Sequence, residues 1–193
     1  MLKIAIVGNI ASGKSTVEDY ISSKGYSVYD TDKISHEILN YSKDEIKAAF
    51  CKYDILEKNQ ISRKKIAEIV FANKEEKQKL ENIIYPKLKQ NLSEIFDNCK
   101  SRVVFVSVPL LFEVGWQNLF DKIIFVKADD DIRLSRLMKR NNLTKEQALL
   151  RINSQKPQAD KVMRSDFIIC NNDDIISLQK QTDEIIILLE DME

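Results

Sequence analysis

The chain contains little cysteine, histidine, proline or glycine. Among 193 residues there are three cysteines, one histidine, three prolines and four glycines. The cysteines, Cys51, Cys99 and Cys170, are odd in number, lie far apart and form no Cys-x-x-Cys pair. With His36 as the one histidine, this spacing argues against a disulfide framework or a Cys/His metal cluster. We therefore expect free thiols in a reducing cytoplasm.

The chain also lacks an excess of charge of one sign and lacks long apolar runs. Thirty Lys and Arg residues balance thirty Asp and Glu residues. No global field therefore favours nucleic acid or an anionic membrane, and a bound anion needs a local site. No segment approaches the roughly 20 apolar residues of a membrane span, and the apolar run at 4–7 is too short for a signal-peptide core. We expect a cytoplasmic protein without nucleic-acid or membrane partners.

The hydrophobic pattern predicts an α/β fold. Hydrophobic residues make up 44% of the chain and charged residues 31%, which suits a packed core rather than a disordered chain. Short apolar runs alternate with amphipathic helical patterns, and runs such as VVFVSV show little alternation between two faces. Such strands are typical of a parallel sheet that helices cover on both sides. The prediction is a three-layer sandwich with a five-stranded parallel sheet.

The same pattern predicts where the elements begin and end. The expected strands are 2–7, 26–29, 103–108, 122–126 and 167–170. The expected helices are 14–24, ended by Gly25, then 63–72, 75–99, 130–140 and 174–190. A single domain of this length would have a core of about 1–39, 100–128 and 163–193. A charged helical insertion at about 40–99, interrupted by Pro86, and a basic lid at about 129–162 would complete it.

The strongest local signal is a phosphate-binding loop. The segment from Gly8 to Ser15 reads GNIASGKS and matches G-x-x-x-x-G-K-[ST] between a predicted strand and a predicted helix. Glycine permits positive φ angles and close approach of backbone N–H groups to phosphate, and the helix start adds a partial positive charge. The expected nucleotide contacts are Gly8, Ala11, Ser12, Gly13, Lys14, Ser15 and Thr16.

Three side chains of this loop have distinct expected roles. Lys14 reaches the β- and γ-phosphates, Ser15 coordinates Mg²⁺ and Thr16 bonds the α-phosphate. The alternative is a chance glycine-rich turn, which leaves the lysine and the two hydroxyls unexplained. The motif by itself does not distinguish a kinase from a GTPase or a motor ATPase.

Two aspartates, Asp30 and Asp32, follow the second predicted strand, where open α/β sheets bind their ligands. In extended backbone, a spacing of two residues aims both carboxylates to one side. We expect Asp32 to accept the proton of an acceptor hydroxyl and Asp30 to position magnesium-bound water. The alternative is that one of them caps a helix beginning near Lys33.

Further candidate acceptor contacts are His36, Leu111 and Glu113. Glu113 ends the run PLLFE at the carboxyl edge of the third strand and can face the acceptor or the metal, or simply pack there. Core packing is the expected role of Leu110 and Phe112. His36 lies on an amphipathic pattern and is expected to have a structural or weak substrate-contact role.

Two lid arginines, Arg136 and Arg140, lie four residues apart on one helical face. They are expected to meet phosphate charge and to close over the nucleotide. The alternative is a solvated basic face paired with acidic neighbours.

Taken together, the ordered motifs resemble the dephospho-CoA kinase family over nearly the whole chain. They are GNIASGKST, DTD, IVFANKEEKQKLENIIYP, VPLLFE and RLMKRNNLT, with Gln155 and Asn171 at matching positions. The resemblance implies a P-loop fold with strand order 2-3-1-4-5 and transfer of phosphate from ATP, with Mg²⁺, to the ribose 3′-hydroxyl of dephospho-CoA. It also implies that Asp32 is the base, that Arg140 contacts the phosphates, and that Arg136 and Asn171 lie near the nucleotide.

Some features depart from the family pattern, and other functions stay open. Tyr85-Pro86 stands where the family usually has His-Pro, and Ala11 replaces a usual glycine at a variable position. The alternatives are a kinase for a nucleoside monophosphate or another small alcohol, and a P-loop nucleotide switch or binding protein. Against a GTPase, the nearest match to Asn-Lys-x-Asp is Asn-Lys-Glu-Glu at 73–76, which lacks the aspartate. Both a monomer and a small homo-oligomer are compatible with the sequence.

Overall fold

The computed structural model describes residues 1–192, which separate into two compact units. The sheet unit consists of residues 1–30 and those from 100 onward, and the helical unit is Thr31–Cys99. The predicted insertion began near residue 40, whereas the helical unit begins at Thr31. The earlier start arises because strand β2 (Val28–Asp30) runs directly into helix α2 (Thr31–Tyr41).

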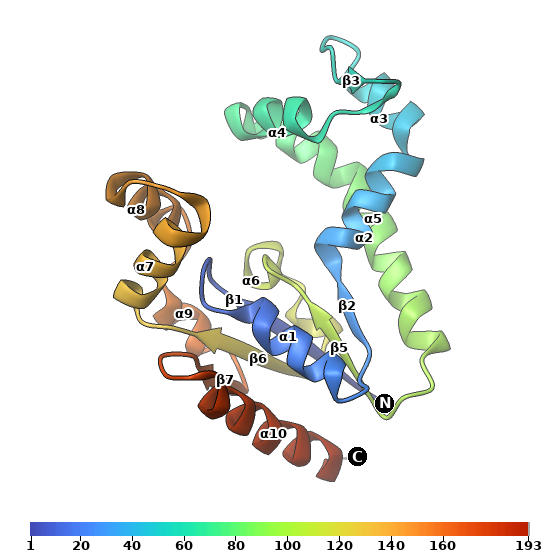
Figure 1. Cartoon of the computed structure of the whole chain (residues 1–193). Helices are drawn as coiled ribbons and strands as arrows, with labels where there is room; N and C mark the ends of the chain where they lie inside the picture. Colours follow the sequence, from blue (N-terminus) through green and yellow to red (C-terminus); the bar gives the residue numbers. More distant parts are fainter. Residues whose placement is uncertain (193) are drawn as a thin grey trace. The chain divides into compact units, whose positions relative to one another are not determined.

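The sheet unit contains five parallel strands in the order β2-β5-β1-β6-β7 (Figure 1). Besides β2, they are β1 (Leu2–Gly8), β5 (Val103–Ser107), β6 (Lys122–Lys127) and β7 (Phe167–Cys170). When only these five strands are numbered in chain order, the sheet order is 2-3-1-4-5, as predicted. The labels run higher because the helical unit contributes a short hairpin, β3 (Leu56–Glu57) and β4 (Gln60–Ile61).

Both faces of the central strand β1 are buried. Ile4 and Ile6 point to one face and Ala5 and Val7 to the other, and all four side chains are inaccessible to solvent. The face with Ile4 and Ile6 packs against helices α1 and α10, which lie side by side on the sheet (Figure 1). Burial on both faces explains why the strands read as continuous apolar runs.

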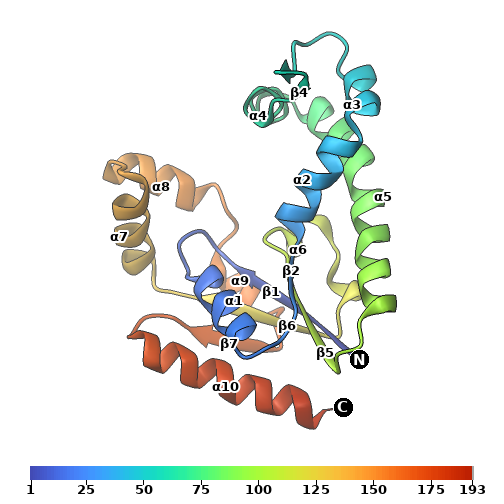
Figure 2. The same cartoon turned by 45° about the vertical axis from the view of Figure 1, so that its right-hand side comes forward.

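The helices of the sheet unit connect and cover these strands. They are α1 (Lys14–Ser23), α6 (Leu111–Val114), the 3-10 turn η1 (Gln117–Leu119), α7 (Asp130–Asn141), α8 (Lys145–Asn153), α9 (Gln158–Val162) and α10 (Ile175–Asp191). The single tryptophan, Trp116, is buried between α6 and η1. Helices α7 and α8 lie side by side in both ribbon views (Figure 2) and share a small core around Leu137, Ala148 and Ile152.

The helical unit is built around one long helix, α5 (Lys74–Asn98), against which α2, α3 (Lys43–Ala49) and α4 (Arg63–Ala72) pack. Asn73 separates α4 from α5, and its side-chain oxygen accepts hydrogen bonds from the first-turn N–H groups of α5.

The predicted interruption of α5 at Pro86 is wrong, because the helix continues through this residue. A proline inside a helix costs about 3 kcal/mol. Ile84, Leu88 and Leu92, on the same side of α5, are buried against the other helices, and this packing offsets the cost.

Candidate active site

Gly8 at the end of β1 and Gly13 just before α1 leave little room for a side chain. Gly13 has φ of 93°, and a Cβ there would lie 1.9 Å from Asn171 Nδ2. A Cβ on Gly8 would lie 2.6 Å from Ser12 Oγ. Ala11 has φ of 61° although it carries a Cβ, a left-handed conformation that costs roughly 1–2 kcal/mol. The loop is therefore held in a shape that the chain does not adopt by local preference.

Three backbone N–H groups remain available where this loop meets α1. The N–H of Ser12 donates to Asn9 O at 3.0 Å, and that of Ile10 donates to Gln155 Oε1 at 2.7 Å. Within residues 1–192, the N–H groups of Gly13, Lys14 and Ser15 donate to no protein acceptor. Together with the helix dipole, these groups form a cradle for phosphate oxygens.

Buried polar atoms without partners surround the same loop. Within the described chain, Ser12 Oγ and Arg136 Nη1 are buried and have no hydrogen-bond partner. Arg136 Nη1 would lie 3.9 Å from a Cβ on Gly13, so it lies close to the phosphate cradle. Leaving such a group unpaired costs about 1–3 kcal/mol, and a bound phosphate would supply the acceptor.

Lys14 extends from the first position of α1 toward the end of β5. Its ammonium group donates to Glu18 Oε1 at 2.7 Å and also to the hydroxyl of Ser107, which is fully buried. These contacts place the positive charge at the carboxyl edge of the sheet, where ligands of open α/β sheets bind.

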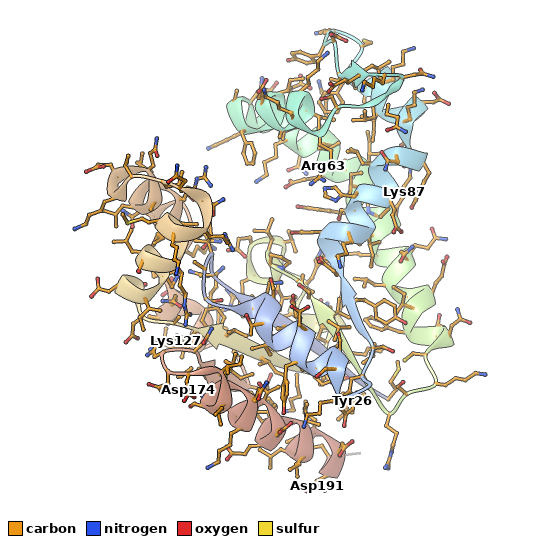
Figure 3. The ribbon with its side chains drawn as sticks, viewed as in Figure 1. Tyr26, Arg63, Lys87, Lys127, Asp174 and Asp191 are labelled. Carbon is orange, nitrogen blue, oxygen red and sulfur yellow. The ribbon has the colours of Figure 1, made fainter. Side chains whose placement is uncertain are left out.

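Asn171, which directly follows β7, joins the loop to α7. Its Nδ2 donates to Ser12 O at 2.8 Å, its Oδ1 accepts from Arg136 Nη2 at 3.3 Å and its N–H donates to Lys127 O at 2.8 Å. Lys127 and Asp174, which caps α10, are labelled near this edge in Figure 3. Asn171 thus positions both the loop backbone and an arginine of α7.

Two cavities open beside the loop within the sheet unit. One, of about 260 Å³, is lined by Gly13, Thr16, Arg136, Asn171, Asp173, Ile175 and Leu178. The other, of about 500 Å³, is lined by Ala11, Gly13, Arg136, Lys139 and Arg140. Arg136 and Arg140, one helical turn apart on α7, therefore share a cavity with the phosphate loop.

The two candidate aspartates lie in different units. Asp30 is the last residue of β2, and Asp32 lies in the first turn of α2, where a carboxylate is favoured by the helix dipole. The prediction of a helix beginning near Lys33 was late by about half a turn. Because α2 begins at Thr31, the two-residue period of a strand does not apply to this pair.

The residues after β5 agree with the prediction in part, since Phe112 is buried as expected. Leu111 is fully buried, whereas Leu110, expected to pack in the core, is 48% exposed. The alternation expected of a strand does not extend here, because β5 ends at Ser107 and α6 begins at Leu111. Glu113 forms an ion pair of 2.8 Å with Lys161 of α9, whose side chain is buried.

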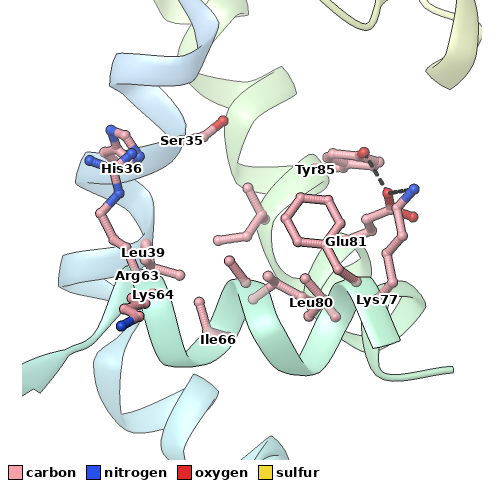
Figure 4. Close-up of a pocket in the computed structure, with 14 residues that line it drawn as sticks. Ser35, His36, Leu39, Arg63, Lys64, Ile66, Lys77, Leu80, Glu81 and Tyr85 are labelled. Atoms are coloured by element: carbon pink, nitrogen blue, oxygen red, sulfur yellow. Dashed lines mark hydrogen bonds and ion pairs between the residues drawn. The ribbon is translucent and has the colours of Figure 1, made fainter. Parts of the chain in front are cut away.

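The helical unit contains a cavity of about 640 Å³ that the sequence did not reveal (Figure 4). Its lining residues come from α2, α4 and α5, and they are Ser35, His36, Leu39, Arg63, Lys64, Ile66, Ala67, Val70, Phe71, Lys77, Leu80, Glu81, Ile84 and Tyr85. The wall is mainly apolar, with the cations Arg63, Lys64 and Lys77 among the polar groups. An apolar chain that carries anionic groups fits this lining.

Tyr85 forms a polar part of this cavity. Its hydroxyl donates to Glu81 Oε1 at 2.8 Å, and Glu81 also lies 3.6 Å from the ammonium group of Lys77. Burial, followed by the hydrogen bond to Glu81, raises the pKa of Tyr85. The phenol therefore stays protonated and neutral at physiological pH.

Two further observations bound the chemistry. Within residues 1–192, no helix is both long and apolar enough to cross a membrane. In the same part of the chain, no group of three or more His, Cys, Asp or Glu side chains is arranged to hold a metal ion.

The strand order, the phosphate cradle and the arginines beside it define a P-loop nucleotide-binding protein.

Comparison with known proteins narrows this class. The family model for dephospho-CoA kinase matches residues 2–177. A dephospho-CoA kinase of Listeria innocua is 41% identical over 184 residues, which cover 92% of each chain. Among solved structures, TT1252 from Thermus thermophilus has a TM-score of 0.89 at 29% identity, covering 97% of this chain and 96% of its own. Dephospho-CoA kinase from Campylobacter jejuni has a TM-score of 0.75 at 34% identity, covering 95% and 94%. The chain belongs to the dephospho-CoA kinase family.

Proposed function

We propose that this protein transfers the γ-phosphate of ATP to the ribose 3′-hydroxyl of dephospho-CoA, giving coenzyme A and ADP in the last step of coenzyme A synthesis. The observation that carries the proposal is the extent of the family match, which includes the helical unit as well as the phosphate loop. A protein that shared only nucleotide binding would match in the sheet unit alone.

The sheet unit would bind the donor. The free N–H groups of Gly13, Lys14 and Ser15 would receive phosphate oxygens, with Gly8, Ala11 and Ser12 shaping the loop and Thr16 bonding the α-phosphate. Lys14, now paired with Glu18, would turn to the β- and γ-phosphates.

The hydroxyl of Ser15 would hold Mg²⁺, which neutralises phosphate charge when bound. Magnesium at such sites usually keeps several waters and is bound by substrate phosphates together with one or two protein groups. In this proposal Ser15 would be the direct protein ligand, and Asp30 would act through magnesium-bound water.

The basic segment would complete the donor site. Arg136 Nη1 is buried without an acceptor beside Gly13, which suits it to a phosphate oxygen. Arg140 would stabilise the charge that develops on the transferred phosphoryl group, and Asn171 would hold Arg136 and Ser12 in place.

The remaining candidate residues have proposed roles toward the acceptor. Asp32 would accept the proton of the 3′-hydroxyl as the new bond forms, and Asp30 would position magnesium-bound water. His36 and Glu113 would contact the acceptor. Leu111, being buried, would shape the site from within rather than touch the substrate.

The cavity of the helical unit supports an acceptor with a long arm. Its apolar wall suits an aliphatic chain, and Arg63, Lys64 and Lys77 suit the phosphates that dephospho-CoA carries. A small acceptor such as shikimate would leave most of its 640 Å³ unused.

The compartment and assembly complete the proposal. The three cysteines are free thiols, as is typical of a reducing cytoplasm, where we place the reaction. We expect a monomer or a small homo-oligomer, which sedimentation would distinguish.

The test is ADP release from ATP and Mg²⁺ with dephospho-CoA, beside AMP, shikimate and no acceptor, with the product weighed by mass spectrometry. The expected result is ADP with dephospho-CoA and a product heavier by one phosphoryl group. ADP with another acceptor alone would instead identify a kinase for a different substrate. ATP binding without any acceptor-dependent product would identify a nucleotide switch or binding protein.

A further inference from the structure

The peptide groups of Ile10 are held on both sides by side chains from far along the chain. The N–H of Ile10 donates to Gln155 Oε1 at 2.7 Å, and its carbonyl accepts from Arg133 Nε at 3.0 Å. Beside them, Asn9 Nδ2 donates to Lys156 O at 3.0 Å. The outer side of the phosphate loop is thus fixed by α7 and by the segment that follows α8.

These contacts directly precede the strained residue of the loop. Ala11 follows Ile10 and has the left-handed φ of 61°. A residue with a Cβ keeps such a conformation when the surrounding structure over-determines it. The hydrogen bonds to Ile10 supply that constraint, because they fix the peptide groups on the N-terminal side of Ala11.

Arg133 is itself rigidly placed. Its side chain is 2% exposed, and its Nη1 donates to Asp130 Oδ1 at 2.7 Å. Asp130 also accepts from Gln158 Nε2 at 3.0 Å, and the same Gln158 nitrogen donates to Ala128 O at 2.9 Å. The carbonyl of Ile10 is therefore held by a residue of α7, and the N–H of Ile10 is held by Gln155.

We propose that Gln155 is a positioning residue for the nucleotide site. Its amide oxygen takes the Ile10 N–H, so the Ile10–Ala11 segment stays in the shape that leaves the N–H groups of Gly13, Lys14 and Ser15 for phosphate. Gln155 acts through the loop and not by touching the nucleotide. The inference rests on the proposed use of this loop for ATP.

The test compares Gln155→Leu, which removes the acceptor, with Gln155→Glu, which keeps it. The dissociation constant of a non-hydrolysable ATP analogue with Mg²⁺ is measured by calorimetry, and the kcat and KM for ATP by ADP release. Gln155→Leu is expected to weaken binding and raise the KM about 10-fold, the scale of one lost hydrogen bond to a partly buried donor, with kcat changed less than about 2-fold. Gln155→Glu is expected to stay near wild type.

A second substitution tests whether backbone strain is the link. Glycine adopts left-handed φ without the Cβ penalty. Combining Ala11→Gly with Gln155→Leu is therefore expected to restore part of the lost affinity. The matched control is Gln90→Leu on an exposed face of α5, where the glutamine side chain donates to Glu94 of the same helix, and its nucleotide affinity should be unchanged.

Two outcomes would overturn the inference. One is a Gln155→Leu protein that binds the analogue as wild type does. The other is an equal loss of affinity and thermal stability in Gln155→Leu and Gln155→Glu, with no recovery on Ala11→Gly, since that would show a general packing role. Because the binding assay contains no acceptor, these results are read independently of whether dephospho-CoA is the substrate.

Discussion

The candidate site of the sheet unit depends mainly on backbone groups, whereas the cavity of the helical unit depends on side chains. In the sheet unit the phosphate cradle is made of backbone N–H groups, and its side chains, such as Asn171, mainly hold that backbone in place. In the helical unit the large cavity is made of side chains from three helices, and none of its described lining residues has a positive φ.

This difference determines what each unit can tolerate. A backbone cradle depends on residues that lack a Cβ or adopt positive φ, so a single methyl group at Gly13 would collide with Asn171. A cavity lined by apolar side chains depends on volume and accepts exchanges of similar size. We therefore expect changes in the sheet unit to abolish donor chemistry and changes in the helical unit to alter acceptor affinity by degrees.

The largest effect is expected for Lys14→Ala. Removing the cation that reaches the β- and γ-phosphates should lower kcat by about 100- to 1000-fold or more, because its charge stabilises the transition state. ADP release under saturating substrates measures this. Lys180→Ala, on the exposed face of α10, is the control and should behave as wild type. If the kcat of Lys14→Ala stayed within about 10-fold of the wild-type value, the proposed role of Lys14 in phosphoryl transfer would be wrong.

Asp32→Asn should come next. It should keep ATP binding but lower the rate of phosphoryl transfer at least about 100-fold, the scale of general-base catalysis. Single-turnover rates and ATP affinity, measured on the same sample, separate the two effects, with Asp19→Asn on α1 as control. Unchanged transfer would remove Asp32 as the base, and the chemistry would then belong to the sheet unit alone.

Val70→Trp tests the helical unit. The larger ring should fill part of its cavity and raise the KM for dephospho-CoA roughly 10-fold, since overpacking costs about 1–3 kcal/mol, while the KM for ATP stays the same. Glu68→Trp places the same ring on the exposed side of α4 and serves as control. If the KM for ATP rose together with the KM for dephospho-CoA, the assignment of ATP and dephospho-CoA binding to separate units would be wrong.

The smallest expected effect concerns stability away from both cavities. Burial, with the hydrogen bond to Glu190, raises the pKa of Tyr26 to about 12. The folded protein thus favours the neutral phenol, so its contribution is complete below the unfolded pKa of about 10 and is lost as the pH rises toward 12.

Tyr26→Phe is therefore expected to cost about 1 kcal/mol at pH 8 and less at pH 11. Thermal unfolding midpoints of the variant and the wild type at these two pH values measure the loss of stability. Tyr41→Phe, at an exposed position, is the reference. A stability difference that did not shrink with pH would contradict the assignment.

The contrast between the units also explains what could be read from the sequence. The strands β5 and β7 are short apolar runs rich in β-branched and aromatic residues, so they were placed to within one residue. The phosphate loop was predicted from its glycines, and the structure gives Gly13 the positive φ that favours this residue. The strand order was predicted from the family resemblance, and the structure has this order.

The features that were missed depend on contacts between distant residues. The cavity of the helical unit is lined by residues such as Ile66 and Ile84, whose spacing looks the same as that of an ordinary helix core. The bond between Ile10 and Gln155 spans 145 positions, and no short motif marks it. Pro86 was given its usual local meaning, which packing along α5 overrides.

Trp116 can serve as an intrinsic fluorescent probe of unfolding. It is the one indole in the sequence and lies buried in the sheet unit, so fluorescence excited selectively at tryptophan, without the six tyrosines, reports on that unit. Far-ultraviolet circular dichroism, by contrast, includes the long helix α5. In one denaturant titration, coincident curves would mean that the two units unfold as a single cooperative system, and separated curves would give each its own free energy of unfolding.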